Sequence, residues 1–202
     1  MILSKEDYLY YLEADRLALG RNKIRFSDKL IRWVSPDYIW AFQRLLRKTE
    51  YYRNVKNKGV INKLIYLFLR LKYKELSVKL GFTIPENVFG PGLAIVHYGT
   101  IVVNQNVKVG ANCRIHVGTN IGASGGTNKA PQIGDNVYIA PGAKIFGDIR
   151  IPNNCAIGAN SVVTKSFEEE GMMIAGIPAK IIKPIAIEQI IKHIEPNSVS
   201  RS

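Results

Sequence analysis

The sequence predicts a mainly β fold, in which residues 81–185 form a parallel β-helix and residues 1–80 form an α-helical region ahead of it. Two observations predict the β-helix. An aliphatic residue returns at every sixth position from Val103 to Val163, with one gap, and turn-forming triplets such as GAN, GDN and PNN lie between. Neither an α-helix of period 3.6 nor a strand of period 2 gives a period of six. A chain that turns a corner every six residues gives it, and three sides close a coil of about eighteen residues.

The inward side of each coil is also marked by a second position, four residues after most of the aliphatic ones. The aliphatic series is Val103, Val109, Ile115, Ile121, Ile133, Ile139, Ile145, Ile151, Ile157 and Val163, and the second series is Val107, Cys113, Thr119, Val137, Ala143, Ile149, Cys155 and Ser161. Both cysteines of the chain occupy this second position, so we expect them as small core residues and not as a disulfide. That usage fits a reducing compartment.

The N-terminal region is expected to be helical. Ser35 and Pro36 suit an N-cap and a first helical position, and apolar residues at helical spacing follow in PDYIWAFQRLLRKTEYY. Gly59 separates this helix from a second one, VINKLIYLFLRLKYKELSVKL, which Gly81 ends. The most apolar stretch, residues 64–71, is too short to span a bilayer, and the first residues show no signal-peptide pattern.

Positive charge is concentrated in the same region. Residues 1–80 hold 18 Lys and Arg against 8 Asp and Glu, whereas residues 81–202 hold 10 against 8. The region is therefore the candidate for contact with an anionic partner such as phosphate groups, a membrane surface or nucleic acid. A solvated helical surface explains the charge equally well, and no nucleic-acid-binding motif accompanies it. The second helix suits packing, for example against a partner subunit, better than it suits a membrane surface.

The repeat has two irregularities, and its pattern is lost toward the C-terminus. The segment 81–102 is two positions out of step with the series that starts at Val103, which indicates a first coil with a local irregularity near His97. Ile133 follows Ile121 by twelve positions, and the Gly- and Asn-rich sequence between them predicts a loop that projects from one corner. From Ser166 the pattern decays into a last coil, and residues 186–202 form a C-terminal tail with a short helical piece.

Two of the three histidines, His97 and His116, lie inside the repeats. Stacking by eighteen residues, with the two-residue slip, places His97 near Val117, so that the two imidazoles border one edge of the prism. An imidazole can take a proton from a hydroxyl group near neutral pH. From spacing alone a structural histidine is the alternative. His193, in the tail, is expected at the surface.

Several phrases in residues 81–185 carry a resemblance to a known family. HxGxIV, GAKIxGxI, IGANSVV and AGIPAK occur in order, within GLAIVHYGTIVVNQNVKVGANCRIHVGTNIG and the later repeats. The chain here resembles the bacterial serine acetyltransferases and, more broadly, the hexapeptide-repeat acyltransferases of left-handed β-helix fold. The N-terminal region is more similar to relatives among the surface-polysaccharide acetyltransferases, which share HYGTIVV and a short basic helical start.

The resemblance implies a cytoplasmic homotrimer without a metal, whose acetyl-CoA sites lie in clefts between adjacent prisms. It implies that His97 is the general base on an acceptor hydroxyl, which attacks the thioester directly through an oxyanion held by hydrogen-bond donors. The CoA-binding positions that it implies are Gly122, Ala123 and Ser124 along the pantetheine arm, the small residues Ala143 and Ala159, and Lys165 and Lys180 for the phosphates. Ordinary surface lysines are the alternative for the last two.

The chain departs from the serine acetyltransferase pattern around the acceptor. Those enzymes have an aspartate before the catalytic histidine and another one coil earlier, where this sequence has Val96 and Phe82. They also carry an arginine and a histidine in the projecting loop, where this sequence has Lys129 and Ala130. A site without those charges should reject free serine. We therefore expect a sugar hydroxyl of a surface or capsular polysaccharide as acceptor, with serine O-acetylation in cysteine biosynthesis as the alternative.

Some other group must orient His97 if no aspartate does. Asn104 and His116 are the candidates that we include among the catalytic residues, and Asn120 and Glu86 are further possibilities.

Two other functional classes compete with the acetyltransferase. A zinc β-helix of the carbonic anhydrase type needs three histidines at ligand spacing, and only two are suitably placed. A non-catalytic β-helix would serve as an assembly module. A lipid-linked glycan acceptor would connect the basic N-terminal region to the inner face of the membrane.

Overall fold

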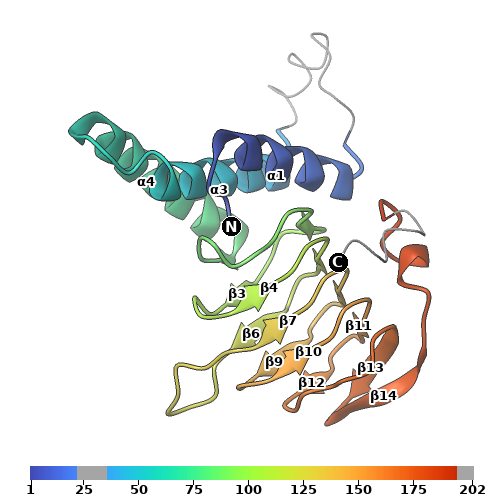
Figure 1. The fold of residues 1–202 in the computed structure, drawn as a ribbon. Coiled ribbons are helices and arrows are strands. Elements are labelled where there is room, and N and C mark those ends of the chain that lie inside the picture. The colour runs from blue at the N-terminus through green and yellow to red at the C-terminus, as the bar shows by residue number, and fades with distance from the viewer. Residues whose placement is uncertain (22–35, 195–202) are drawn as a thin grey trace.

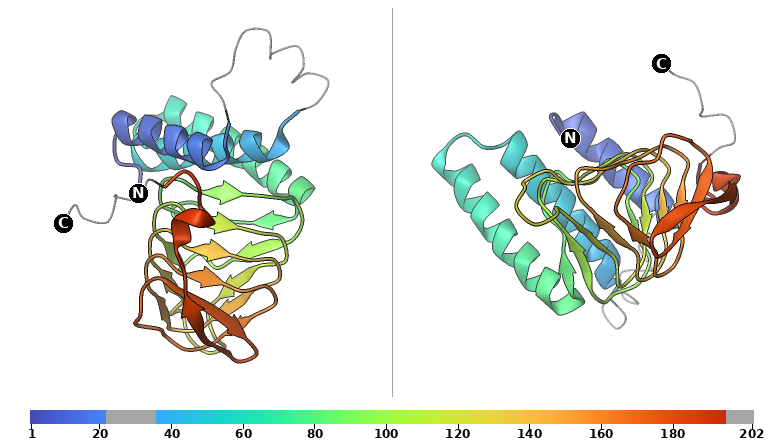
Figure 2. Two further views of the ribbon diagram at one scale, coloured as in Figure 1. Left: turned by 90° about the vertical axis from the view of Figure 1, so that its right-hand side faces the viewer. Right: turned by 90° about the horizontal axis from the view of Figure 1, so that it is seen from below.

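The computed structural model describes residues 1–21 and 36–194, and it consists of a helical layer on one end of a prism (Figure 1). The helices are α1 (Lys5–Ala18), α3 (Tyr38–Asn54) and α4 (Val60–Leu80). Below them the chain winds through successive coils, each made of short strands separated by turns (Figure 2). Ser35, the expected N-cap, lies outside the described residues. Asp37 caps α3 instead, because its side chain accepts a hydrogen bond from the backbone N–H of Trp40.

The prism has three faces, one for each sheet, and we number them by the order of their strands. Face 1 holds β1 (Phe82–Thr83), β3 (Ile101–Val103), β6 (Asn120–Gly122), β9 (Lys144–Phe146) and β12 (Val162–Val163). Face 2 holds β4 (Lys108–Val109), β7 (Gln132–Ile133) and β10 (Arg150–Ile151). Face 3 holds β2 (Ala94–Ile95), β5 (Arg114–Ile115), β8 (Tyr138–Ile139), β11 (Ala156–Ile157), β13 (Met172–Gly176) and β14 (Ala179–Pro184). The pairs are parallel except for the hairpin of β13 and β14.

The strand register confirms the period of six. Tyr138 pairs with Ala156 and Lys144 pairs with Val162, a separation of eighteen residues in both cases. Across the loop after β6 the separation becomes 24, which adds one whole hexapeptide and keeps the phase. All ten aliphatic residues of the series, and both cysteines, are buried in the interior that the three faces enclose.

Turns between the faces use residues that tolerate a positive φ. Asn112, Asn136 and Asn154 have φ values of 57°, 56° and 60°, a left-handed conformation in which asparagine is several-fold enriched. They form a column at the edge between face 2 and face 3. The side-chain amide of Asn112 donates to Asn136 at 2.9 Å, and that of Asn136 donates to Asn154 at 2.8 Å. This column explains the Asn-rich triplets that the sequence repeats.

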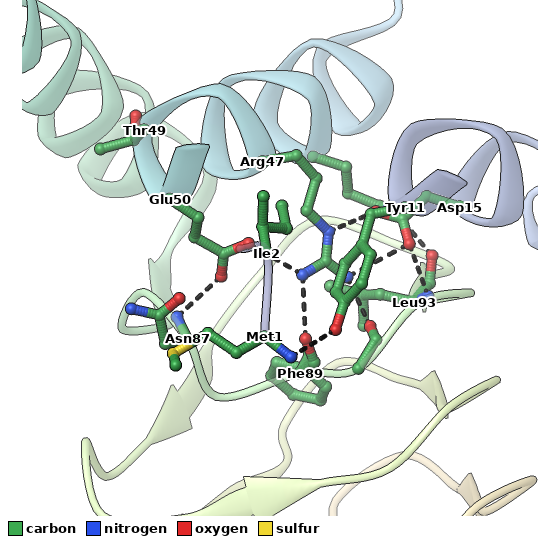
Figure 3. A network of polar contacts seen from close by, with 12 residues as sticks. Met1, Ile2, Tyr11, Asp15, Arg47, Thr49, Glu50, Asn87, Phe89 and Leu93 are labelled. Atoms are coloured by element: carbon green, nitrogen blue, oxygen red, sulfur yellow. Dashed lines mark hydrogen bonds and ion pairs between the residues drawn. The ribbon is translucent and has the colours of Figure 1, made fainter. Parts of the chain in front are cut away.

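The helical layer is fixed to the first coil by a buried polar network around Arg47 (Figure 3). The guanidinium of Arg47, from α3, contacts Asp15 of α1 at 2.8 Å and Glu50 at 3.0 Å, and all three side chains are at most 2% exposed. Arg47 also donates to the backbone carbonyls of Phe89 and Gly90, and Asp15 accepts from the backbone N–H groups of Gly92 and Leu93. The helices and the prism therefore share one core.

The observed ends of α4 and of the prism can be compared with those that the sequence predicted. Gly59 and Gly81 flank α4, as expected. After Ser166, β13 pairs in parallel with β11 and forms the expected last coil, and the β13–β14 hairpin then closes the far end. The tail contains the short 3-10 helix η1 (Ile187–Gln189) and is described to residue 194. Among the described residues, no helix is long and apolar enough to cross a membrane.

Candidate active site

His97 lies in the turn from face 3 to face 1 of the first coil, which is two residues longer than the turns below it. The pairings of Ile95 with Ile115 and of Val103 with Ile121 leave seven residues in this turn and five in the next. The imidazole is exposed at this widened corner. Gly99 has a φ of 122°, and a Cβ there would lie 2.6 Å from the side chain of Val117. The corner therefore needs glycine at this position.

The C-terminus of α4 supports the same corner. The backbone N–H of Gly99 donates to the carbonyl of Leu80 at 2.9 Å, and that of Ile101 donates to the carbonyl of Gly81 at 3.1 Å. Gly81 caps α4 in the left-handed conformation, which turns the chain directly into β1. The position of His97 thus depends on the helical layer as well as on the prism.

His116, in the next coil, lies beside His97 as the stacking predicted. The ring centroids are 6.0 Å apart, and the ring of Tyr138 packs edge-on against His116 at 5.1 Å. The Nε2 atom of His116 is buried and has no hydrogen-bond partner among the described residues. Burial, with the nearby charges of Arg114 and His97, lowers the pKa of His116 to about 4. This second imidazole is therefore neutral at physiological pH.

Of the groups considered for orienting His97, His116 lies directly beside it. Glu86 is held on the other side by Arg53, at 3.1 Å, and by the hydroxyl of Tyr66, at 3.2 Å. Asn104 lies at the edge between face 1 and face 2, where its side chain accepts from the backbone N–H of Asn106 at 2.9 Å. Within one chain, face 1 therefore separates Asn104 from His97, and a role for Asn104 beside His97 stays a prediction.

Small residues continue from His116 down the prism. The strand pairs of face 3 end at aliphatic residues, and the residue after each of these continues the same alignment. His116 is thereby aligned with Ala140, then with Gly158 and Ala175. Ala175 pairs in turn with Lys180 of the hairpin. The four aligned positions span three strand spacings, or about 14 Å. Ala159, which follows Gly158, is exposed on the same edge. This edge could accommodate an extended chain close to the backbone, with a lysine at its far end.

The remaining expected CoA positions lie elsewhere. Gly122, Ala123 and Ser124 leave face 1 at its edge with face 2, where the backbone N–H of Asn104 donates to the carbonyl of Ile121. Lys165 follows β12 toward this same edge. The structure therefore divides the expected site between two edges of one prism. One edge carries the histidines, Ala159 and Lys180, and the other carries the loop and Lys165.

Ala143 needs a correction. Its side chain is fully buried inside the prism, because the fourth position after an aliphatic residue points inward. The methyl group therefore packs in the core and cannot line a bound ligand. The resemblance alone suggests this residue for the CoA site, whereas its place in the hexapeptide indicates an inward direction.

Two neighbours of the histidines were missed from the sequence. Tyr138 borders His116, and the half-buried ammonium of Lys144, on face 1, donates to the backbone carbonyl of Gly118 just beyond His116. Counting 24 residues across the loop would have found both, since Tyr138 pairs with Arg114 and Lys144 pairs with Asn120. His193 was expected at the surface but is half-buried, and its ring lies 3.2 Å from the side-chain oxygen of Asn112.

Comparison with known proteins supports this assignment of the fold. The family model described as "Bacterial transferase hexapeptide (six repeats)" matches residues 130–165. A serine acetyltransferase of Staphylococcus aureus is 36% identical and is matched over 55% of this chain and 60% of its own length. One of Staphylococcus epidermidis is 40% identical over 49% of this chain and 47% of its own. The chain carries hexapeptide transferase repeats and resembles the serine acetyltransferases.

Solved structures extend the likeness to the helical layer. The serine acetyltransferase of Brucella abortus strain S19 in complex with coenzyme A superposes with a TM-score of 0.69 at 25% identity, covering 90% of this chain and 70% of that one. The expected left-handed β-helix with N-terminal helices is thereby confirmed. The chain spans about 60% of the length of the curated relative from S. aureus. Among the described residues, no three His, Cys, Asp or Glu side chains lie together as metal ligands would.

Proposed function

We propose that this protein is an acetyl-CoA-dependent O-acetyltransferase whose general base is His97. The observation that carries the proposal is the pair of imidazoles, His97 and His116, at the head of an edge lined by small residues. The serine acetyltransferase likeness supports the same chemistry. If the protein were a non-catalytic assembly module, the exposed histidine at a widened corner would have no explanation.

The reaction would proceed in a direct transfer. His97 accepts the proton of the acceptor hydroxyl while the hydroxyl oxygen attacks the thioester carbonyl carbon. The tetrahedral intermediate collapses with cleavage of the carbon–sulfur bond, and the proton returns from His97 to the departing thiolate. The products are an O-acetyl ester and CoA. No covalent acetyl-enzyme is needed.

His116 would assist as a neutral neighbour. Its lowered pKa keeps it uncharged at neutral pH, so it would not repel the imidazolium that forms on His97. The buried Nε2 atom, which has no partner among the described residues, can pair with the ring of His97 or with the bound substrate. Asn104 has no such access within one chain.

Acetyl-CoA would be held by both edges of the prism in a homotrimer. The edge with Ala159 and Lys180 would take the pantetheine arm and a phosphate of one CoA. The loop residues Gly122, Ala123 and Ser124, with Lys165, would complete that site from the neighbouring prism. A stack of parallel coils offers long flat faces, and symmetric association would bring two unlike edges together. The division of the site that one chain shows supports this arrangement.

The acceptor has two candidates. L-serine is the one that the comparisons favour, because the relatives are named serine acetyltransferase. A sugar hydroxyl is the second candidate. The side chain of Phe82 is buried against Phe42, Glu86 is held by Arg53, and Ala130 is buried, so these positions supply no free charge to a zwitterionic amino acid. The expectation of a polysaccharide acceptor rests on the departures at Val96, Phe82, Lys129 and Ala130 and on the N-terminal resemblance to surface-polysaccharide acetyltransferases.

The decisive experiment follows CoA release from acetyl-CoA with L-serine and, separately, with a panel of sugars. We expect His97→Ala to lose roughly 100-fold or more in kcat, because general-base catalysis contributes about that much. His193→Ala is the matched control, since that histidine lies against Asn112 on another edge, and it should retain activity. Full activity of His97→Ala would refute the assignment. Release with serine but with none of the sugars would exclude the second acceptor.

A further inference from the structure

The outward face of α4 is apolar, which is unusual for a helix that already packs against the protein on its other side. The inward side chains are Leu69, Tyr73, Ser77 and Leu80, all buried. The outward ones are each more than half exposed, and we call them the α4 face: Val60, Ile61, Leu64, Leu67, Phe68, Leu71 and Val78. At 100° per residue these seven positions form one stripe opposite the buried side. Figure 2 shows most of α4 beside the prism, and the exposure of these side chains shows that neither α3 nor the described coils cover them.

Positive charges flank the α4 face on both sides. Lys63, Arg70 and Lys74 lie along one border of the stripe, and Lys72 and Lys79 lie along the other. The segment 53–80 holds eight Lys and Arg and a single acidic residue, Glu75. That carboxylate is paired with Lys72 at 2.9 Å. Glu75 itself lies within the stripe, Arg53 pairs with Glu86, and Lys79 lies over the ring of Tyr38. The face therefore combines exposed apolar side chains with an excess of positive charge, carried chiefly by Lys63, Arg70 and Lys74.

We propose that the α4 face binds the surface of an anionic lipid bilayer. Apolar side chains would enter the boundary between headgroups and acyl chains, and the flanking lysines would reach the negatively charged headgroups. The inference stands on the geometry of α4 and does not depend on the enzymatic function proposed above. The sequence favoured packing over a membrane surface as the role of this helix. In the structure α4 packs through its buried side chains, and the α4 face lies on the opposite side of the helix, where it takes no part in that packing.

Charge favours this occupant over a second copy of the chain. Two α4 faces placed together would bring the flanking lysines of both copies near one another, with only the already paired Glu75 on each side to offset them. Like charges at an interface are unfavourable. The exposed apolar residues of α1 provide a contrast within the molecule. Leu9 and Leu17 are about half exposed, but acidic Glu6 and Glu13 lie on the same side of that helix.

Vesicle binding by the full chain tests the proposal. We expect co-sedimentation with vesicles of phosphatidylcholine containing 30% phosphatidylglycerol, as a probe composition of roughly physiological anionic content, and none with phosphatidylcholine alone. Leu64→Ser/Phe68→Ser should weaken binding roughly tenfold or more, since it removes apolar contact. Lys63→Gln/Lys74→Gln should weaken it by a similar factor and reduce its dependence on salt.

The matched control is Leu9→Ser/Leu17→Ser on α1, which should bind anionic vesicles as the unmodified protein does. All variants change exposed side chains, and their thermal unfolding is compared first. Sedimentation equilibrium without lipid is measured in parallel. No binding of the unmodified protein to anionic vesicles would overturn the proposal. Equal binding by the α4 and α1 variants would also overturn it. A change of oligomeric state in Leu64→Ser/Phe68→Ser, with vesicle binding unchanged, would assign the α4 face to a second copy instead.

Discussion

At the scale of single residues, the hexapeptide phase decides what each side chain can do. Ile and Val at the first position, and small residues at the fifth, point inward and build the core. The eighteen-residue spacing of the coils predicts that His116 lies beside His97, and the structure confirms it. Ala143 was misassigned because resemblance was carried over without regard to phase. Asn104 is near His97 in sequence, but face 1 lies between them within one chain.

The buried imidazole of His116 should make stability depend on pH. Its pKa is about 4 in the native state, against an ordinary value of 6.5. Above pH 6.5 the ring is neutral in both states, and its contribution to the free energy of unfolding is fully present. As the pH falls from 6.5 toward 4, the unfolded chain binds a proton that the native protein does not bind, so stability is lost.

A variant isolates this effect from other titrating groups. We expect His116→Gln to lose less stability than the unmodified protein between pH 7 and pH 5, since glutamine does not titrate. Urea unfolding of both proteins at the two pH values measures the difference. An equal loss in both would mean that His116 titrates alike in the native and unfolded states.

At the scale of elements, the sequence pattern could not predict the contacts between α1, α3 and the first coil. Amphipathic spacing predicted α3 and α4, and the glycines at 59 and 81 predicted the limits of α4. Nothing in the spacing predicted that Arg47 would be fully buried, because its partners lie 3, 32, 42 and 43 residues away. Partners so distant in sequence meet only after the helices and the coil have docked.

The same network predicts a large effect of one substitution. Arg47→Met would leave the carboxylates of Asp15 and Glu50 buried without their cation. We expect a loss of about 3–5 kcal/mol in the free energy of unfolding. Lys72→Met is the control, because Lys72 and its ion-pair partner Glu75 are 55% and 70% exposed, and it should cost about 0–1 kcal/mol. Urea unfolding measures both, and similar losses would show that the buried network adds little beyond a surface ion pair.

The corner of His97 is where the two structural regions meet. The network around Arg47 holds the residues that lead into β2, and α4 ends against Gly99 on the other side of the turn. A two-residue insertion in a regular coil would ordinarily disturb the stacking above it. Here the helical layer takes the place of a further coil, so the insertion is accommodated and His97 is left exposed. The sequence indicated the insertion through the slip in phase but did not indicate its support.

At the scale of the whole molecule, the division of the expected site between two edges predicts complementation between inactive chains. His97→Ala removes the proposed general base from the edge between face 3 and face 1. Ser124→Trp places a bulky ring on the exposed loop at the edge between face 1 and face 2. Each variant alone should be inactive. If each site uses one edge from each of two neighbouring prisms, a trimer that contains both variants should have about one intact site in three.

Co-expression of the two variants with different affinity tags, followed by purification through both tags, yields the mixed assemblies. We expect CoA release to recover to about a third of the unmodified rate, whereas His97→Ala mixed with itself under the second tag should stay inactive. Sites contained within one chain could not recover, because every chain would carry one lesion. Recovery therefore tests the shared site directly, and its absence in stable mixed trimers would place both the base and the CoA loop within single prisms.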